Sequence, residues 1–96
     1  MTTIKEHQGW VKEAWKKSSK KIEEKDELLF LMEEIGEMAE AVRKLNGNKN
    51  DKEFASDIEK EMGDILLSLI TLAIRYKIDL ETAFEKTKQS VIGRYV

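Results

Sequence analysis

Hydrophobic residues recur at helical spacing in two segments of the N-terminal half of the chain. The first segment covers residues 3–18, and Thr2 or Thr3 stands where a helix N-cap is favoured. The second covers residues 26–46, with Asp26 as the candidate cap, and its apolar residues follow i, i+3, i+4, i+7 spacing up to an Asn-Gly pair that ends the helix. Both segments are predicted to be amphipathic helices.

The C-terminal half repeats this pattern after a short Asn- and Gly-rich turn at residues 46–50, which favours an antiparallel return. A third helix is predicted from Asp51 to Tyr76, and it is apolar on more than one side between residues 66 and 74. Asp79 is the candidate cap of a fourth helix. The pattern predicts an all-α, four-helix, bundle-like fold, and the doubly apolar third helix predicts at least a dimer.

Composition agrees with this prediction and narrows the function. The chain has 96 residues, 41% hydrophobic and 38% charged, with no proline, which favours one helical domain over residues 1–96. It has no cysteine, so disulfides and thiolate metal sites are excluded. A net charge of -2 gives no case for binding nucleic-acid polymers, and the lack of a signal peptide or an apolar run long enough for a membrane span predicts a cytoplasmic protein.

Two pairs of acidic residues carry the candidate chemistry. Glu34 and Glu37 lie on the second predicted helix, and Glu61 and Asp64 on the third. Each pair has i, i+3 spacing, so its two carboxylates project from one helix face. If the two helices pack antiparallel, the pairs can converge into a set of oxygen ligands suited to Mg²⁺. The alternative is that these acids only solvate helix faces, as most such pairs do.

The sequence around the acidic pairs resembles a known signature. Residues 33–40 read EEIGEMAE and residues 61–66 read EMGDIL. This closely resembles the E-E-x-x-E then E-x-x-D signature of the MazG-like nucleotide pyrophosphohydrolases. The resemblance covers about residues 10–95, and the embedded glycines Gly36 and Gly63 leave open surface beside the acids.

The resemblance implies both an activity and roles for the acids. Members of the family are all-helical, form dimers or pairs of dimers, and cleave nucleoside triphosphates between the α and β phosphates to monophosphate and pyrophosphate. Carried over by position, Glu34, Glu37, Glu61 and Asp64 would be ligands of Mg²⁺, for which Mn²⁺ could substitute. Glu33 would complete the catalytic set, either by supporting the metal ligands from behind or as a base that orients the attacking water. The alternative for Glu33 is a solvated residue on the helix surface.

The resemblance also implies substrate contacts outside the acidic pairs. Trp10 and Trp15 would help to sandwich the base, and Lys86 and Arg94 would contact phosphates. For each residue a structural alternative stays open, namely core packing for the tryptophans and a solvated surface for the two cations. The chain departs from the family pattern at residues 90–92, which read SVI where many members carry an asparagine.

These observations lead to one main functional prediction and one alternative. We expect Mg²⁺-dependent hydrolysis of nucleoside triphosphates in nucleotide-pool housecleaning, by a homodimer or homotetramer. The alternative is a non-catalytic helical oligomerisation or interaction module, which the apolar faces suit equally well. A di-iron bundle is disfavoured, because it needs Glu-x-x-His pairs and His7 is the only histidine.

Overall fold

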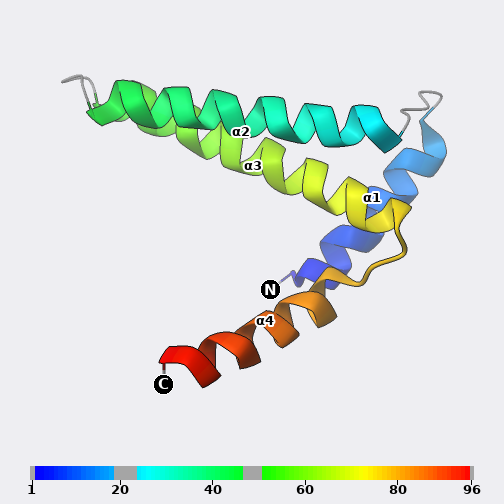
Figure 1. Cartoon of the computed structure of the whole chain (residues 1–96). Helices are drawn as coiled ribbons and strands as arrows, with labels where there is room; N and C mark the ends of the chain where they lie inside the picture. The colour runs from blue at the N-terminus through cyan, green and yellow to red at the C-terminus, as the bar shows by residue number, and fades with distance from the viewer. Residues whose placement is uncertain (1, 19–23, 47–50, 96) are drawn as a thin grey trace. The chain divides into compact units, whose positions relative to one another are not determined.

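Within the residues that it describes, the structure, a computed structural model, consists of four α-helices (Figure 1). It describes residues 2–18, 24–46 and 51–95, and no β-strand occurs within those ranges. The helices are α1 (Ile4–Lys17), α2 (Glu24–Asn46), α3 (Asp51–Arg75) and α4 (Leu80–Tyr95). The prediction of an all-α fold with four helices is confirmed.

The chain forms two compact units, and α3 contributes to both of them. The first unit combines Met1–Lys21 with Ile70–Val96, so it holds α1, the last turns of α3 and α4. The second unit, Ile22–Leu69, holds α2 and the longer N-terminal part of α3.

The first unit has a small core and a well-capped first helix. Its buried apolar residues are Val11 of α1 and Ile70 and Ala73 of α3. Thr3 caps α1, because its hydroxyl accepts from the Glu6 N–H at 3.1 Å while the Glu6 carboxylate accepts from the Thr3 N–H at 3.3 Å. This capping box satisfies two N–H groups in the first turn, and it confirms the cap at Thr3.

The side chain of Gln8 in α1 forms hydrogen bonds with the connection between α3 and α4. The amide of Gln8 donates to the Ile78 carbonyl at 2.6 Å and accepts from the Leu80 N–H at 3.1 Å. Asp79 caps α4, accepting from the Glu81 N–H at 3.0 Å and from the Thr82 hydroxyl at 3.2 Å. The predicted cap at Asp79 is confirmed, whereas the contacts of Gln8 leave no signal in the sequence.

The C-terminus of α3 closes with a left-handed residue that is not glycine. Lys77 has φ 56°, and its N–H donates to the Ile74 carbonyl at 3.1 Å. The Ile78 N–H donates to the Ala73 carbonyl at 2.8 Å. These two bonds form a Schellman motif, in which glycine is the usual residue at the position that Lys77 occupies.

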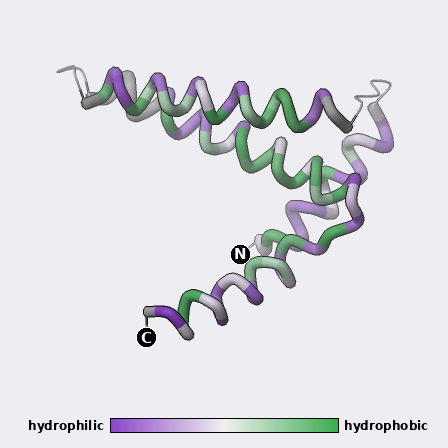
Figure 2. The backbone as a smooth tube through the Cα atoms, in the orientation of Figure 1, coloured by the Kyte–Doolittle hydropathy of each residue, from purple (hydrophilic) through white to green (hydrophobic). Residues whose placement is uncertain are grey.

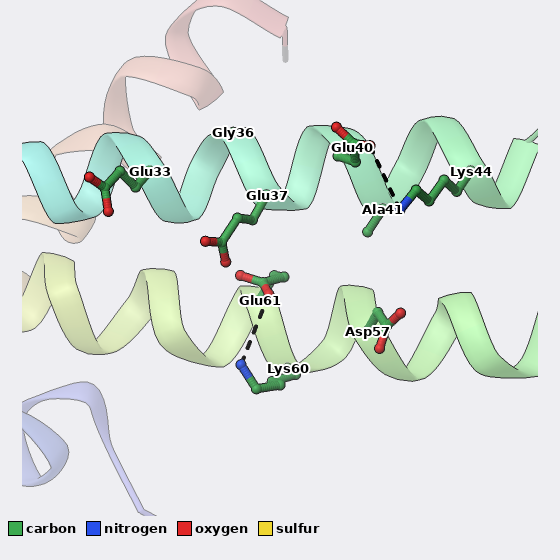
Figure 3. A pocket seen from close by; sticks show the side chains of 9 residues that line it. All are labelled: Glu33, Gly36, Glu37, Glu40, Ala41, Lys44, Asp57, Lys60 and Glu61. Carbon is green, nitrogen blue, oxygen red and sulfur yellow. Dashed lines mark ion pairs between the residues drawn. The ribbon is translucent and has the colours of Figure 1, made fainter.

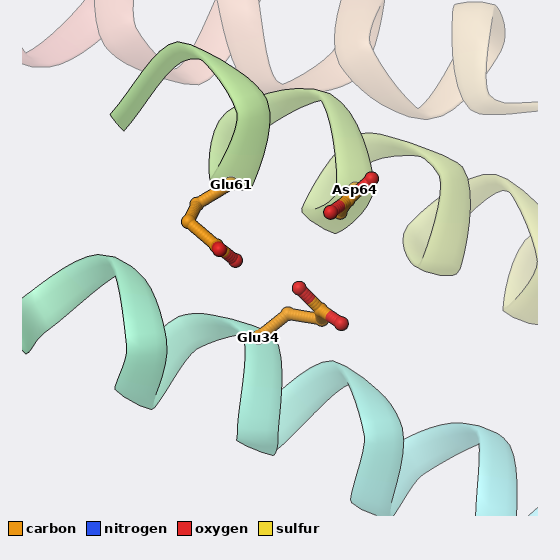
Figure 4. A group of neighbouring side chains, drawn as sticks. All are labelled: Glu34, Glu61 and Asp64. Carbon is orange, nitrogen blue, oxygen red and sulfur yellow. The ribbon is translucent and has the colours of Figure 1, made fainter. Parts of the chain in front are cut away.

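In the second unit, α2 and α3 lie side by side and run antiparallel (Figures 3 and 4). The third helix begins at Asp51 as predicted, but the predicted cap at Asp26 is wrong, because α2 already begins at Glu24. Asp26 therefore lies in the first turn, where a carboxylate still interacts favourably with the helix dipole. The predicted turn at residues 46–50 lies outside the described residues from 47 onward.

Much of the apolar surface of the second unit remains exposed. Figure 2 shows hydrophobic positions recurring along α2 and α3. The large apolar side chains that are 38% to 61% exposed are Leu28, Leu29, Phe30, Met32, Ile35 and Val42 on α2, and Met62, Leu66, Leu67 and Leu69 on α3. In the part of the chain that the structure describes, no helix is both long enough and apolar enough to cross a bilayer.

Candidate functional site

Three carboxylates converge between the two helices of the second unit. Glu34 projects from α2, and Glu61 and Asp64 project from α3 (Figure 4). One oxygen from each carboxylate lies within 4.8 Å of the oxygens of the other two. The i, i+3 spacing of Glu61 and Asp64 places both side chains toward Glu34, so two helices share one acidic cluster, defined here as Glu34, Glu61 and Asp64.

Two oxygens of this cluster are buried without a donor. Glu34 Oε2 and Glu61 Oε2 are inaccessible to solvent and have no hydrogen-bond partner among the described residues. The Glu61 side chain is only 13% exposed, whereas that of Asp64 is 41% exposed. A buried carboxylate oxygen without a partner is costly, so the arrangement requires either a proton or a cation.

The pKa of Glu61 is raised, in keeping with a carboxylate that needs a proton or a cation. The adjacent Glu34 carboxyl, which can share a proton with Glu61, raises the pKa of Glu61 above its ordinary value, and partial burial raises it further. The charge of Lys60 and the neighbouring Glu37 side chain lower the pKa of Glu61 without cancelling the shift. The protonated form is favoured because two carboxylates this close repel each other when both are ionised.

Lys60 is the cation that already contacts the cluster. Its ammonium lies 2.9 Å from Asp64 Oδ2 and 4.0 Å from Glu61 Oε1. The hydrogen bond and charge of Asp64, with the charge of Glu61, raise the pKa of Lys60 above its ordinary value. Sequence reasoning missed this residue, although the i, i+4 spacing of Lys60 and Asp64 is a visible signal for an ion pair.

A cavity of about 730 Å³ adjoins the cluster. Glu37 of α2 and Glu61 of α3 point toward one another across it (Figure 3). Gly36 and Ala41 contribute surface without bulky side chains, and a Cβ added at Gly36 would meet nothing within 4 Å. The complete lining comprises Glu33, Gly36, Glu37, Glu40, Ala41, Lys44, Asp57, Lys60 and Glu61.

The predicted acidic residues therefore divide into two groups. Glu34, Glu61 and Asp64 are brought together in the cluster. Glu33 and Glu37 are exposed, lie outside the cluster and line the adjoining cavity. Glu37 faces Glu61 across the cavity, whereas Glu33 lies one residue before Glu34 on the same helix.

The donor set of the cluster fits a hard divalent cation. It offers only carboxylate oxygens, which suit Mg²⁺ and Mn²⁺ and do not select zinc or a soft metal. A cation between the two helices would also give the buried oxygens of Glu34 and Glu61 the partner that they lack. Glu34, Glu61 and Asp64 are the residues that would hold it, and Glu37, which faces Glu61, is a candidate for a further ligand.

The predicted substrate contacts belong to the first unit. Trp10 is 69% exposed, and Trp15 is partly buried with its indole N–H donating to Thr71 Oγ1 at 2.9 Å. Lys86 and Arg94 are exposed on α4. The partly buried ring of Trp15 thus has a structural role, as the packing alternative expected for it. Substrate binding by Trp10, Trp15, Lys86 and Arg94 stays a prediction.

Comparison with known proteins gives one match. A family model described as the MazG nucleotide pyrophosphohydrolase domain matches residues 23–95, well over half of the chain. No curated protein and no solved structure matches the chain. The matched region includes both helices of the acidic cluster and continues through α4.

Proposed function

Because this chain belongs to the MazG nucleotide pyrophosphohydrolase family, we propose that it hydrolyses nucleoside triphosphates between the α and β phosphates, with Mg²⁺ as cofactor. Water is added across one phosphoanhydride bond, and the products are a nucleoside monophosphate and pyrophosphate. Normal or damaged deoxynucleoside triphosphates are the proposed substrates, and housecleaning of the nucleotide pool in the cytoplasm, where these compounds are made and used, is the proposed role.

The observation that carries this proposal is the acidic cluster with its two buried, unpartnered oxygens. Left without a cation, the cluster would repel a triphosphate. Mg²⁺ held there would neutralise phosphate charge and make a water molecule more acidic. The chain supplies no cysteine and only one histidine, so the proposed reaction uses water and no side-chain nucleophile.

The remaining acidic residues are assigned by their positions beside the cluster. Glu34, Glu61 and Asp64 hold the cation, and Glu37 completes the ligand set from across the cavity. Glu33 orients the attacking water and accepts its proton. The cavity of about 730 Å³ is large enough to admit the phosphate chain next to these groups.

The family resemblance also assigns contacts with the base to Trp10 and Trp15 and contacts with phosphate to Lys86 and Arg94. The largely exposed ring of Trp10 supports a stacking role, because an aromatic face accepts any base. Trp15 contributes the second stacking surface, and Lys86 and Arg94 bind phosphate. The role of Trp15 follows from the family resemblance alone, whereas those of Trp10, Lys86 and Arg94 are also supported by the exposure of their side chains.

We further propose that one domain spans residues 1–96 and functions as a homodimer or homotetramer. The exposed apolar side chains of α2 and α3 support the oligomer, since monomeric proteins seldom expose so many on adjacent helices. Light scattering of the purified protein would give the stoichiometry, and a single cooperative unfolding transition would support the single domain.

The proposed function is tested by incubating the protein with a nucleotide panel and Mg²⁺ and separating the products. Monophosphate and pyrophosphate in equal amounts are expected, whereas diphosphate with orthophosphate would contradict the mechanism. Asp64→Asn should lower kcat by more than about 100-fold while helix content is retained. The matched control is Glu59→Gln, an exposed α3 carboxylate outside the cluster and the cavity, which should retain wild-type rates.

The exposed apolar surface also favours the alternative of a non-catalytic interaction module. The two functions differ in their response to metal. A cation site raises the melting temperature by mass action when Mg²⁺ is added, and an interaction module without such a site does not.

A further inference from the structure

Lys60 contacts the acidic cluster in a way that the proposed reaction does not use. Its ammonium lies 2.9 Å from Asp64 Oδ2, so it pairs with one of the carboxylates proposed to hold the cation. It also lies 4.0 Å from Glu61 Oε1, the carboxylate whose other oxygen is buried without a partner. One lysine therefore contacts two of the three carboxylates of the cluster.

We propose that Lys60 is an internal counter-ion that competes with the divalent cation and thereby sets the cation affinity of the acidic cluster. This inference rests on the proposed function, because it assumes that the cluster binds a cation. In the metal-free protein Lys60 offsets part of the repulsion among Glu34, Glu61 and Asp64. When the cation binds, the ammonium has to leave Asp64.

The position of the Lys60 ammonium indicates that it opposes cation binding and does not assist it. A positive charge in contact with Asp64 would lie within a few ångströms of any cation bound to the same carboxylate, and like charges at that separation repel. Lys60 is 70% exposed, so its ammonium is free to move into water at small cost. The competition is therefore moderate, since solvent screens both the ion pair and the repulsion.

A second lysine in the same cavity provides a matched comparison. Lys44 also lines the cavity, and it forms an i, i+4 pair with Glu40 at 3.7 Å. Glu40 is outside the acidic cluster. A variant at Lys44 thus removes the same charge from the same cavity without touching a proposed ligand.

The test is calorimetric titration of the full chain with Mg²⁺ alone, in the absence of nucleotide. Lys60→Met should bind Mg²⁺ about three- to tenfold more tightly than wild type. Lys44→Met should stay within about twofold of wild type, and Lys60→Arg, which keeps the competing charge, should restore wild-type affinity. In EDTA, Lys60→Met should also melt at a lower temperature, because the carboxylates lose their counter-ion.

Each outcome of the titration decides the inference. Equal or weaker Mg²⁺ binding by Lys60→Met overturns it while leaving the cation site intact, and so does an equal gain in affinity for Lys44→Met, which would indicate a general charge effect. If wild type, Lys60→Met and Lys44→Met all fail to bind Mg²⁺, the proposed function itself fails and the inference fails with it.

Discussion

The indole N–H of Trp15 donates to the Thr71 hydroxyl at 2.9 Å and so joins α1 to α3 within the first unit. The bond is partly buried, so its loss is only partly replaced by water. We predict that Trp15→Phe lowers the free energy of unfolding by about 1 kcal/mol, measured by urea denaturation.

A double-mutant cycle separates this bond from the packing of the ring. Thr71→Val removes the acceptor and leaves a side chain of similar shape. If the bond contributes about 1 kcal/mol, the double variant should lose less free energy of unfolding than the sum of the losses in the two single variants. Strict additivity would show that the two side chains do not stabilise each other.

The second prediction concerns the left-handed residue at the end of α3. Lys77 adopts φ 56°, a conformation that is unfavourable for residues with a Cβ. Lys77→Gly should raise the free energy of unfolding by roughly 0.5–1 kcal/mol, because the relief of strain exceeds the extra entropy of glycine in the unfolded chain. Lys77→Ala is the control, because it removes the charge but keeps the Cβ, and it should give no such gain.

The helices themselves were largely predictable from local signals. The spacing of apolar residues located all four, and Thr3 and Asp79 were correctly identified as caps because capping depends on neighbours within three residues. The start of α2 was predicted two residues too late. Glu24 and Lys25 are good helix formers, so the helix begins on the N-terminal side of Asp26. The left-handed Lys77 could not be predicted, because no glycine or asparagine indicates it.

The third prediction concerns glycine within a helix. Gly36 lies inside α2 and lines the cavity beside the acidic cluster, with open space where a Cβ would be. Gly36→Ala should raise the free energy of unfolding by about 0.5–1 kcal/mol through helix propensity, and should lower kcat/KM because the methyl group narrows the cavity.

Gly9 of α1 is the matched control for this effect. It is also helical, has nothing within 4 Å of its missing Cβ, and belongs to the first unit. Gly9→Ala should give a similar gain in stability with unchanged kcat/KM. Equal kinetic losses in both variants would contradict a specific role of the cavity beside the acidic cluster.

The fourth prediction concerns pH. The raised pKa of Glu61 means that, just above the ordinary carboxyl pKa of about 4.3, the folded protein keeps a proton that the unfolded chain has lost. Protonated Glu61 therefore stabilises the folded protein. This stabilisation is fully present below the pKa of Glu61 in the unfolded chain, and it is lost as the pH rises through the pKa of Glu61 in the folded protein. In EDTA, Glu61→Gln should therefore gain stability relative to wild type as the pH rises through that window.

Magnesium should reverse this pH dependence in the wild type. Only the ionised carboxylate binds a cation, so the increase in melting temperature caused by Mg²⁺ should grow as the pH rises through the same window. Melting curves at several pH values, with EDTA and with Mg²⁺, measure both trends. A Mg²⁺ effect that does not change with pH would contradict the role of Glu61 as a ligand.

The candidate site was predictable in part. The i, i+3 spacing fixed the common face of Glu61 and Asp64, because helix geometry determines it within one element. Which acid of α2 would meet them depends on the register between two helices, and that is set by packing and by the connection, not by spacing. Glu34 and Glu37 were equivalent in the sequence, yet only Glu34 joins the cluster.

The central claim is that carboxylates from α2 and α3 together hold a divalent cation, and its most direct test is anomalous diffraction from crystals grown with Mn²⁺. The account predicts an anomalous peak at coordination distance from carboxylate oxygens of Glu34, Glu61 and Asp64. No peak between these side chains, or a Mn²⁺ ion bound only elsewhere, would contradict it.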